Sequence, residues 1–302
     1  MIAIDLGSNT LRVLEYDCKS EQATGVYEKI VKTADMLEST GVIHHEAVDR
    51  VIYAIQEAKK KIDFDGQPVQ AVTTEAIRRA KNADAVLERI AAETGIVFEV
   101  ISGEDEASLT LLAVDERLKK LHYASQRFVL IDIGGGSTEV VFRYPKGIFS
   151  KSFPVGIVTI AQKYQTLEKI KAALQEEMLA IQMFVAEIYA TEGEADSLVA
   201  TAGTPTTVAA MKLGQTYATY DAARINGTTL KREELGYYLN RLLSLPLEER
   251  EEMVGTGRSD LIAAGILIFE HLYEITGFER CIVVDDGLRE GVALAWCRSH
   301  RK

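Results

Sequence analysis

An approximate internal repeat constrains the fold of this chain more than any other feature of its sequence. Residues 2–16 read IAIDLGSNTLRVLEY, and residues 129–144 read VLIDIGGGSTEVVFRY. Each copy contains an apolar segment, an aspartate, a turn of small residues and a second apolar segment. The two aspartates, Asp5 and Asp132, are 127 residues apart, which is a typical domain length. The repeat therefore predicts two similar halves that join near residues 122–127.

The segments that follow the two turns are rich in β-branched and aromatic residues, which predicts strands. A Rossmann or Walker phosphate loop would open a helix there instead. Each turn taken singly could be an ordinary tight turn, but their repetition favours anion sites, because small residues let backbone N–H groups approach an anion. The predicted phosphate-binding residues of these hairpins are Gly7, Ser8, Asn9, Gly134, Gly135, Gly136 and Ser137.

Two further glycine turns follow predicted strands and precede predicted helices. One lies in LVATAGTPTT at residues 198–207, and the other lies in CIVVDDGLREG at residues 281–291. A helix N-terminus beside a glycine turn readily binds an anion. We therefore predict phosphate contacts from Gly203, Thr204 and Gly287.

Apolar periodicity predicts the remaining elements. Thr206 or Thr207 is expected near the N-cap of the helix that follows residue 203. The chain as a whole alternates strands and helices, which indicates an α/β protein. We predict two domains, residues 1–124 and residues 125–302, with a last helix that can pack back on the first domain. Helices are expected at residues 47–62, 84–94, 104–121, 160–191, 231–243 and 259–275, and additional strands at 67–74 and 97–101.

Charge and composition argue against several classes of protein. The formal net charge of −11 argues against nucleic acid as the main partner, because duplex binding needs a basic surface. No segment reaches the roughly 18 apolar residues of a membrane span, and the N-terminus lacks a basic signal-peptide region. The cysteines Cys18, Cys281 and Cys297 are far apart, which favours reduced thiols in a cytoplasmic protein over a disulfide or zinc site.

The acidic segment at residues 102–106 has two interpretations. Serine followed by acids before an apolar run is typical of a helix cap, where carboxylates suit the helix dipole. Alternatively, one of these acids orients or deprotonates an attacking water. The sequence pattern alone does not choose between them.

Arginines are the candidates for a locally basic site on this acidic chain. Arg78 follows a predicted strand, and ligand sites in open α/β sheets cluster at strand ends. Its guanidinium can bind a phosphate through two hydrogen bonds, although a solvated helix start is the alternative. Arg258 and Arg289 are further candidates. Charges are screened beyond about 8 Å at physiological salt, so a basic site is compatible with an acidic protein.

The four turns together predict a cleft that binds a magnesium–phosphoanhydride. Asp5 and Asp132 would hold the metal or its waters, because hard carboxylate oxygens suit Mg²⁺. The hydroxyls of Ser8, Ser137 and Thr204 would add to the turn amides as phosphate donors.

These segments, in this order, resemble the Ppx/GppA family of exopolyphosphatases and guanosine pentaphosphate phosphohydrolases. The resemblance implies two similar RNase H-like domains of the actin, hexokinase and Hsp70 type, with an interdomain cleft. The matching stretches span nearly the whole chain: DLGSNT at residues 5–10, TEAIRRA at 74–80, ISGEDEA at 101–107, IDIGGGSTE at 131–139, PVGIV at 154–158, AGT at 202–204 and DGLREG at 286–291.

The resemblance also implies roles for individual residues. Glu106 matches the family's catalytic base, and Arg78 matches its phosphate-contacting arginine. Asp132, Gly134 and Ser137 match its second phosphate loop. Glu139 matches its metal-side acid, with Mg²⁺ or Mn²⁺ as the implied cofactor. Ser108 departs from the family, which often has arginine there, so positive charge beside Glu106 is in doubt.

We therefore predict a hydrolase that releases terminal phosphate from polyphosphate or guanosine pentaphosphate, through a water activated by Glu106. We predict no nucleic-acid or membrane partner, and we allow for a homodimer. A small-molecule kinase of the same fold, a non-catalytic alarmone or polyphosphate sensor and an actin-like filament protein are the alternatives. Phosphate release without an acceptor would distinguish the hydrolase from the kinase.

Overall fold

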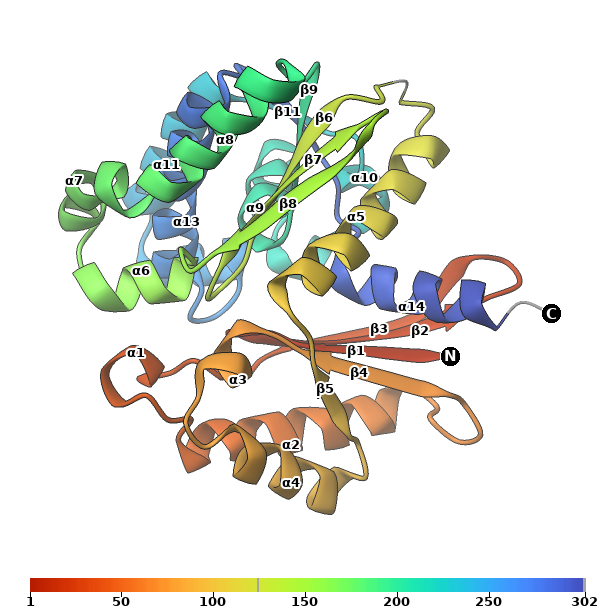
Figure 1. Ribbon diagram of the computed structural model, residues 1–302. Helices are drawn as coiled ribbons and strands as arrows, with labels where there is room; N and C mark the ends of the chain where they lie inside the picture. Colours follow the sequence, from red (N-terminus) through yellow and green to blue (C-terminus); the bar gives the residue numbers. More distant parts are fainter. Residues whose placement is uncertain (124, 301–302) are drawn as a thin grey trace. The chain divides into compact units, whose positions relative to one another are not determined.

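The computed structural model describes residues 1–123 and 125–300. The chain forms two compact units, of which unit 1 combines Met1–Ala113 with the C-terminal segment from Gly287, and unit 2 is Val114–Asp286. Each unit contains a mixed sheet with helices, which confirms the α/β prediction (Figure 1). The domain boundary expected after residue 124 stays a prediction, and Ala124 lies outside the described residues.

The sheet of unit 1 has the strand order β3-β2-β1-β4-β5. β1 pairs antiparallel with β2, β2 pairs antiparallel with β3, and β1, β4 and β5 run parallel. The carboxyl ends of β1, β3, β4 and β5 therefore share one edge of the sheet, which is the usual place for a ligand site. The strands are β1 (Ile2–Leu6), β2 (Thr10–Asp17), β3 (Gln22–Ile30), β4 (Val69–Thr73) and β5 (Phe98–Val100).

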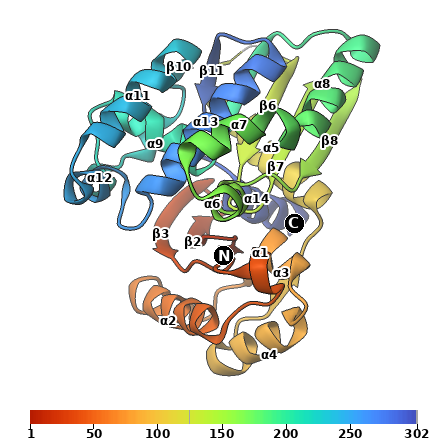
Figure 2. The same cartoon turned by 90° about the vertical axis from the view of Figure 1, so that its left-hand side faces the viewer.

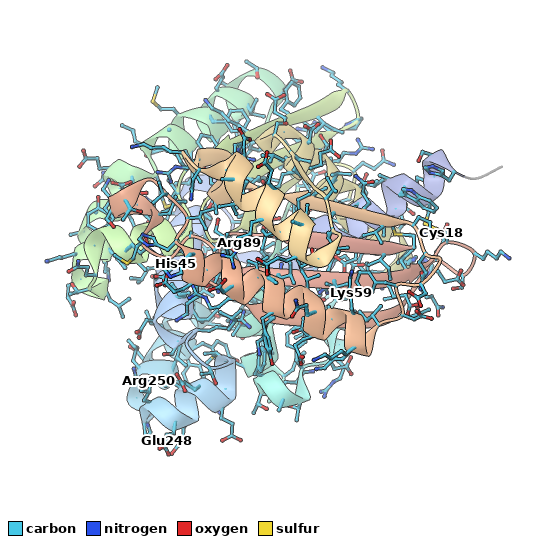
Figure 3. All side chains as sticks on the ribbon, turned by 90° about the horizontal axis from the view of Figure 1, so that it is seen from below. Cys18, His45, Lys59, Arg89, Glu248 and Arg250 are labelled. Carbon is cyan, nitrogen blue, oxygen red and sulfur yellow. A yellow bond between two sulfur atoms is a disulfide. The ribbon has the colours of Figure 1, made fainter. Side chains whose placement is uncertain are left out.

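Helices cover both faces of this sheet. The helices α2 and α4 lie together on one face, which Figure 3 views from below. Arg89 of α4 binds Asp49 of α2 at 2.5 Å, and Lys59 of α2 donates to the Thr94 carbonyl at 2.6 Å. The helices of unit 1 are α1 (Leu37–Thr40), α2 (His45–Lys61), α3 (Glu75–Arg79), α4 (Ala83–Thr94), α14 (Leu288–Ser299) and the part of α5 (Gly103–Lys120) up to Ala113.

The C-terminal helix α14 packs against β1 and β2 on the other face (Figure 1). Its residues Val292 and Ala293 are buried in one apolar cluster with Ala3 and Leu14 of the strands. Each of these four side chains is at most 3% exposed. Burial of such apolar area, at about 25 cal/mol per Å², holds the last helix on the first strands.

A disulfide joins Cys18, just after β2, to Cys297 in the last turn of α14, with the Cα atoms 5.4 Å apart. Figure 3 labels Cys18. The prediction of reduced thiols was wrong for this pair, because packing of α14 on β2 brings together two residues that are 279 positions apart. Cys281 is a free thiol, and complete burial raises its pKa to about 12.

The sheet of unit 2 has the strand order β10-β11-β9-β6-β7-β8. Its β6–β7 hairpin repeats the β1–β2 hairpin of unit 1, as the internal repeat predicted. β6, β9 and β11 run parallel, so their carboxyl ends also share one edge. The strands are β6 (Phe128–Ile133), β7 (Thr138–Tyr144), β8 (Gly147–Phe153), β9 (Ser197–Thr201), β10 (Thr229–Lys231) and β11 (Arg280–Val283).

The central helix of unit 2 is α13, which contacts α6, α7, α8, α9 and α11. Figure 2 shows it between α11 and α7. Most of its side chains are buried, which explains why its sequence is apolar on nearly all sides. The helices are α6 (Ile157–Tyr164), α7 (Leu167–Glu177), α8 (Leu179–Glu192), α9 (Gly203–Lys212), α10 (Ala222–Ile225), α11 (Arg232–Ser244), α12 (Leu247–Val254) and α13 (Ser259–Thr276), with a 3₁₀ turn, η1, at Tyr217–Thr219.

Two helix predictions in this unit were wrong. The single helix expected over residues 160–191 is three helices, because Gln165 has a left-handed φ of 64° and Thr166 caps α7 by accepting from the Lys169 amide. Helix α9 begins at Gly203, so neither Thr206 nor Thr207 is its N-cap. Among the described residues, no helix has the length and apolar content needed to cross a membrane.

Candidate active site

The first predicted phosphate turn, at residues 7–9, is the tight connection between β1 and β2. The Gly7 amide donates to the Thr10 carbonyl at 3.0 Å and closes the turn. Ser8 and Asn9 occupy its tip, and within the described chain their amides donate to no protein acceptor. The turn therefore presents two N–H groups at the carboxyl edge of the sheet, as an anion site requires.

The second predicted turn, between β6 and β7, has the same construction. The Gly134 amide donates to the Ser137 carbonyl at 2.9 Å, and the tip residues are Gly135 and Gly136. The amides of Gly135, Gly136 and Ser137 also find no acceptor in the part of the chain that the structure describes. The repeat thus extends from sequence to hydrogen bonding.

The start of helix α6 supports the second turn from behind. The amides of Ile157 and Val158 donate to the carbonyls of Gly134 and Gly135 at 3.0 and 2.8 Å. Gly156 packs directly on the Gly135 and Gly136 backbone, and a Cβ at Gly156 would overlap it. Residue 156 must therefore be a glycine for α6 to pack this closely on the turn.

Two carboxylates face each other across the second hairpin. Asp132 of β6 lies directly opposite Glu139 of β7, so the two side chains project from the same face of the sheet. Glu139 is 1% exposed, and its Oε1 accepts from the hydroxyls of Ser137 and Ser152, both at 2.7 Å. Like charges in directly opposite positions destabilise a sheet, which a cation bound between them would reverse.

The corresponding position of the first hairpin is different. Asp5 of β1 lies opposite Arg12 of β2, and Arg12 lies opposite Glu28 of β3. The Arg12 Nε donates to Glu28 Oε2 at 3.2 Å. This row alternates acid, base and acid, so it carries its own cation.

The donor chemistry of the second hairpin fits a hard divalent cation. Mg²⁺ is commonly bound through one or two carboxylates together with waters and substrate phosphates. Asp132 and Glu139 supply such a pair, and the Ser137 and Ser152 hydroxyls fix the orientation of Glu139. Within the described residues, no cluster of three or more His, Cys, Asp or Glu side chains is arranged to hold a metal.

The third turn contains an unusual backbone conformation. Ala202, the N-cap of α9, has φ 71° and ψ −173°, a region that essentially only glycine adopts. This conformation places the amides of Gly203 and Thr204 at the helix start, where they have no intrahelical acceptor. Arg258 lies beside them, because a Cβ on Gly203 would be 3.3 Å from its Nη2 atom.

The Thr204 hydroxyl does not match its predicted role. The Thr204 side chain is fully buried and packs against Gly265 of α13. Its Oγ1 has no hydrogen-bond partner among the described residues. Only the amide of Thr204 remains available for the predicted phosphate contact.

The fourth turn is satisfied internally. The Gly287 amide donates to Glu290 Oε2 at 2.9 Å, so it is already occupied. Arg289, a candidate cation, binds the same carboxylate at 2.5 Å. Asp286 accepts two hydrogen bonds from Arg117, at 2.6 and 3.0 Å. Gly287 was predicted to bind phosphate, and its own contacts do not favour that role.

The acidic residues at the start of α5 make different contacts. Ser102 and Asp105 cap the helix reciprocally, since the Ser102 hydroxyl donates to Asp105 at 2.6 Å and the Asp105 amide donates back at 3.1 Å. Glu104 is exposed. The Glu106 side chain is only 13% exposed, and its Oε2 lies 3.8 Å from Arg78 Nη1. The two interpretations of this segment are therefore compatible, with capping assigned to Asp105.

Arg78 is fixed by two contacts besides Glu106. Its Nη1 donates to the Ile101 carbonyl at 2.7 Å, and its Nη2 donates to Glu75 Oε2 at 2.6 Å. Glu75 follows β4, and Ile101 follows β5. The structure thus brings Arg78, Glu106 and the Gly7–Asn9 turn to one edge of the unit 1 sheet.

The sequence analysis missed four residues that support the site. Glu75 and Ser152 bind candidate site side chains, Gly156 packs on the second turn, and Arg117 binds Asp286. The signal for Glu75 and Gly156 was present, because both lie in the motifs at residues 74–80 and 154–158. Ser152 and Arg117 become recognisable only from strand register and helix packing.

The chain is similar to known phosphatases over nearly its whole length. Residues 22–300 match the model of the Ppx/GppA phosphatase family. Exopolyphosphatase 2 of Mycobacterium tuberculosis is 29% identical, over 97% of this chain and 97% of that protein. The crystal structure of the Aquifex aeolicus member of the Ppx/GppA family has a TM-score of 0.74 at 31% identity, covering 100% of this chain and 98% of that chain. An exopolyphosphatase structure from Cytophaga hutchinsonii, 21% identical, shares the fold with a TM-score of 0.85, covering 99% of this chain and 98% of that chain.

Proposed function

Because the chain belongs to the Ppx/GppA phosphatase family, we propose that it hydrolyses phosphoanhydrides and releases terminal orthophosphate from polyphosphate or guanosine pentaphosphate. One observation carries the proposal. The largely buried Glu106 carboxylate lies 3.8 Å from Arg78 at the sheet edge where Ser8 and Asn9 present their amides. A protein that only binds its ligand has no need of a carboxylate placed to activate water.

The proposed reaction is an in-line attack of water on the terminal phosphorus. Turn amides and Arg78 bind the terminal phosphoryl oxygens, while Glu106 orients the water and accepts its proton. The new P–O bond forms as the bridging P–O bond breaks, and the shortened chain leaves. The transition state of phosphoryl transfer is loose, so positioning and electrostatics supply most of the acceleration. The contacts of Arg78 with Ile101 and Glu75 support a fixed guanidinium, which favours such positioning.

We further propose that Asp132 and Glu139 hold Mg²⁺, or Mn²⁺ in its place. A divalent ion bound there would neutralise the charge that develops on the bridging oxygen. The direct opposition of the two carboxylates supports this assignment, because a cation relieves their repulsion. Asp5, which we also predicted as a ligand, already lies opposite Arg12, so we assign it a smaller part in metal binding.

Polyphosphate is the substrate that we favour, because the relatives found most often carry the name exopolyphosphatase. The test measures orthophosphate release from polyphosphate, guanosine pentaphosphate and ATP in parallel, with Mg²⁺ and with EDTA. We expect release from polyphosphate without any acceptor, abolished by EDTA. Tight binding without release would instead identify a sensor, and release only with an acceptor would identify a kinase.

We also propose that the protein is cytoplasmic, because we expect its substrates, polyphosphate or alarmones, to be in the cytoplasm. The Cys18–Cys297 disulfide weighs against a reducing compartment, in which such bonds are rare. Thiol labelling of the protein in freshly lysed cells would test this part, since fully oxidised cysteines would contradict it. A homodimer is tested by sedimentation.

A further inference from the structure

A segment after β3 lies against the first phosphate turn. The amides of Val31 and Lys32 both donate to the Asn9 carbonyl at 2.9 Å, and the Ala34 amide donates to the Ser8 carbonyl at 2.8 Å. Since β3 runs parallel to β1, its carboxyl end lies at the same sheet edge as the turn. The segment at residues 31–34 therefore lies at the same edge of the sheet as Glu106 and Arg78.

The backbone at Lys32 is held in a conformation that lysine rarely adopts. Its φ of 49° lies in the left-handed region, which is uncommon for residues other than glycine, asparagine and aspartate. Arg50 of α2 fixes this conformation by donating to the Val31 carbonyl at 2.7 Å and to the Lys32 carbonyl at 3.2 Å. Such a conformation persists only where its surroundings determine it, and it is commonest at functional sites.

The charge on Lys32 differs from those of the neighbouring arginines. Arg78 binds Glu75 at 2.6 Å, and Arg79 binds Glu38 at 2.9 Å. The Lys32 side chain is exposed, and over residues 1–123 and 125–300 no carboxylate lies within ion-pair distance of its ammonium. Such an ammonium, on a flexible stem that starts from backbone bonded to the Ser8–Asn9 turn, is suited to a phosphate group.

We propose that Lys32 contacts the substrate, with its ammonium binding a phosphate of the chain whose end lies at the Ser8 and Asn9 amides. This inference rests on the proposed phosphohydrolase function and names a residue that determines its affinity for a polyanion. The lysine binds ground state and transition state alike, so its contribution is to KM more than to kcat. Because the contact is exposed, salt weakens it.

The test compares two neutral variants, Lys32→Asn and Lys32→Gln, with Lys32→Arg. Asparagine suits the left-handed backbone, so K32N keeps the segment folded even where K32Q does not. The matched control is Lys19→Gln at the opposite end of the β2–β3 hairpin, an exposed lysine that forms no ion pair with any residue the structure describes. Orthophosphate release from polyphosphate is measured at low and at high ionic strength.

We expect K32N and K32Q to raise KM about tenfold at low salt and to change kcat by less than about twofold. The increase should shrink at high salt, K32R should restore most of the affinity, and K19Q should match the unaltered protein. A KM for both neutral variants equal to that of K19Q would overturn the inference. So would an increase that persists unchanged at high salt or in K32R, because that pattern indicates a structural role.

Equilibrium binding of inorganic tripolyphosphate separates this inference from the proposed function. A weaker Kd in K32N with no turnover by any form would leave the Lys32 contact intact and remove the hydrolase. Turnover by the unaltered protein, with an unchanged Kd and KM in K32N, would support the hydrolase and remove the Lys32 contact.

Discussion

The two hairpins that the internal repeat predicts share a backbone and differ in charge. In both, a glycine amide closes the turn, and the amides at its tip donate to no acceptor within the described part of the chain. The residue opposite the aspartate is Arg12 in the first hairpin and Glu139 in the second. The first hairpin therefore places a base opposite its aspartate, whereas the second places a second acid opposite its aspartate. The proposed function assigns phosphate binding to both hairpins and metal binding to the second one alone.

The two turns are also supported in different ways. The first is held by hydrogen bonds from the segment at residues 31–34, and the second by the start of α6 with Gly156 in van der Waals contact. A loop such as residues 31–34 can carry a long polar side chain, whereas the close backbone packing at Gly156 leaves no room for one. For this reason, the segment that supports the second turn has glycine at residue 156, where no side chain comparable to that of Lys32 would fit.

The largest expected effect tests whether Glu106 of unit 1 acts as the catalytic base. Glu106→Gln should lower kcat about a thousandfold, within the 10²–10⁴ range for general acid–base catalysis, with KM changed less than about threefold. Steady-state orthophosphate release measures both constants. Asp105→Asn, which removes only the helix cap, is the control and should keep most of kcat. A near-normal kcat in E106Q would contradict the role.

The second effect tests the charge difference between the hairpins directly. Glu139→Gln should weaken metal binding 10- to 100-fold, so that the Mg²⁺ concentration for half-maximal activity rises by a similar factor. Arg12→Gln, at the matching position of the first hairpin, should leave that concentration unchanged. Titration of activity with Mg²⁺ reports both values. Equal shifts in the two variants would remove the distinction between the hairpins.

The third effect tests how the second turn is supported. Gly156→Ala places a methyl group on the Gly135–Gly136 backbone, and overpacking of this kind costs about 2 kcal/mol of unfolding free energy. Chemical denaturation measures the loss. Gly147→Ala, where a Cβ meets nothing within 4 Å, should change stability little. If G156A were as stable as G147A, the contact would not be tight in solution.

The smallest effect concerns the third turn and its counterpart in unit 1. Ala202 caps α9 with φ 71°, whereas Thr74 caps α3 with φ −126°. Ala202→Gly should therefore stabilise the protein by about 1 kcal/mol, because it relieves a conformation that only glycine adopts freely. Ala200→Gly, in the neighbouring strand β9, should destabilise it. A loss of stability in A202G would show that no strain is relieved.

Local patterns in the sequence predicted much of this structure. Both hairpins, the helices corresponding to α2, α4, α5, α11 and α13, and the capping role of the acidic segment follow from residues close together in the chain. Glu106 and Arg78 were singled out from their motifs, and the structure places them at one edge of the sheet. Their catalytic roles stay predictions until kinetics test them.

The features that the sequence did not predict depend on register or on packing between distant segments. The opposition of Asp132 and Glu139, and the hydroxyl that Ser152 donates, follow from strand pairing. The break in residues 160–191 depends on a left-handed Gln165, which no propensity favours. The occupied amide of Gly287 depends on the rotamer of Glu290.

The disulfide between Cys18 and Cys297 has a topological consequence. It closes a covalent ring whose circumference includes every residue of unit 2. A single protease cut within the ring therefore leaves one molecule, whose fragments separate only after reduction. The same ring limits how far the ends of unit 2 can diffuse apart when it unfolds, which on the chain-entropy estimate favours refolding by roughly 5 kcal/mol. The oxidation state of Cys18 and Cys297 therefore determines whether α14 is covalently linked to the segment after β2.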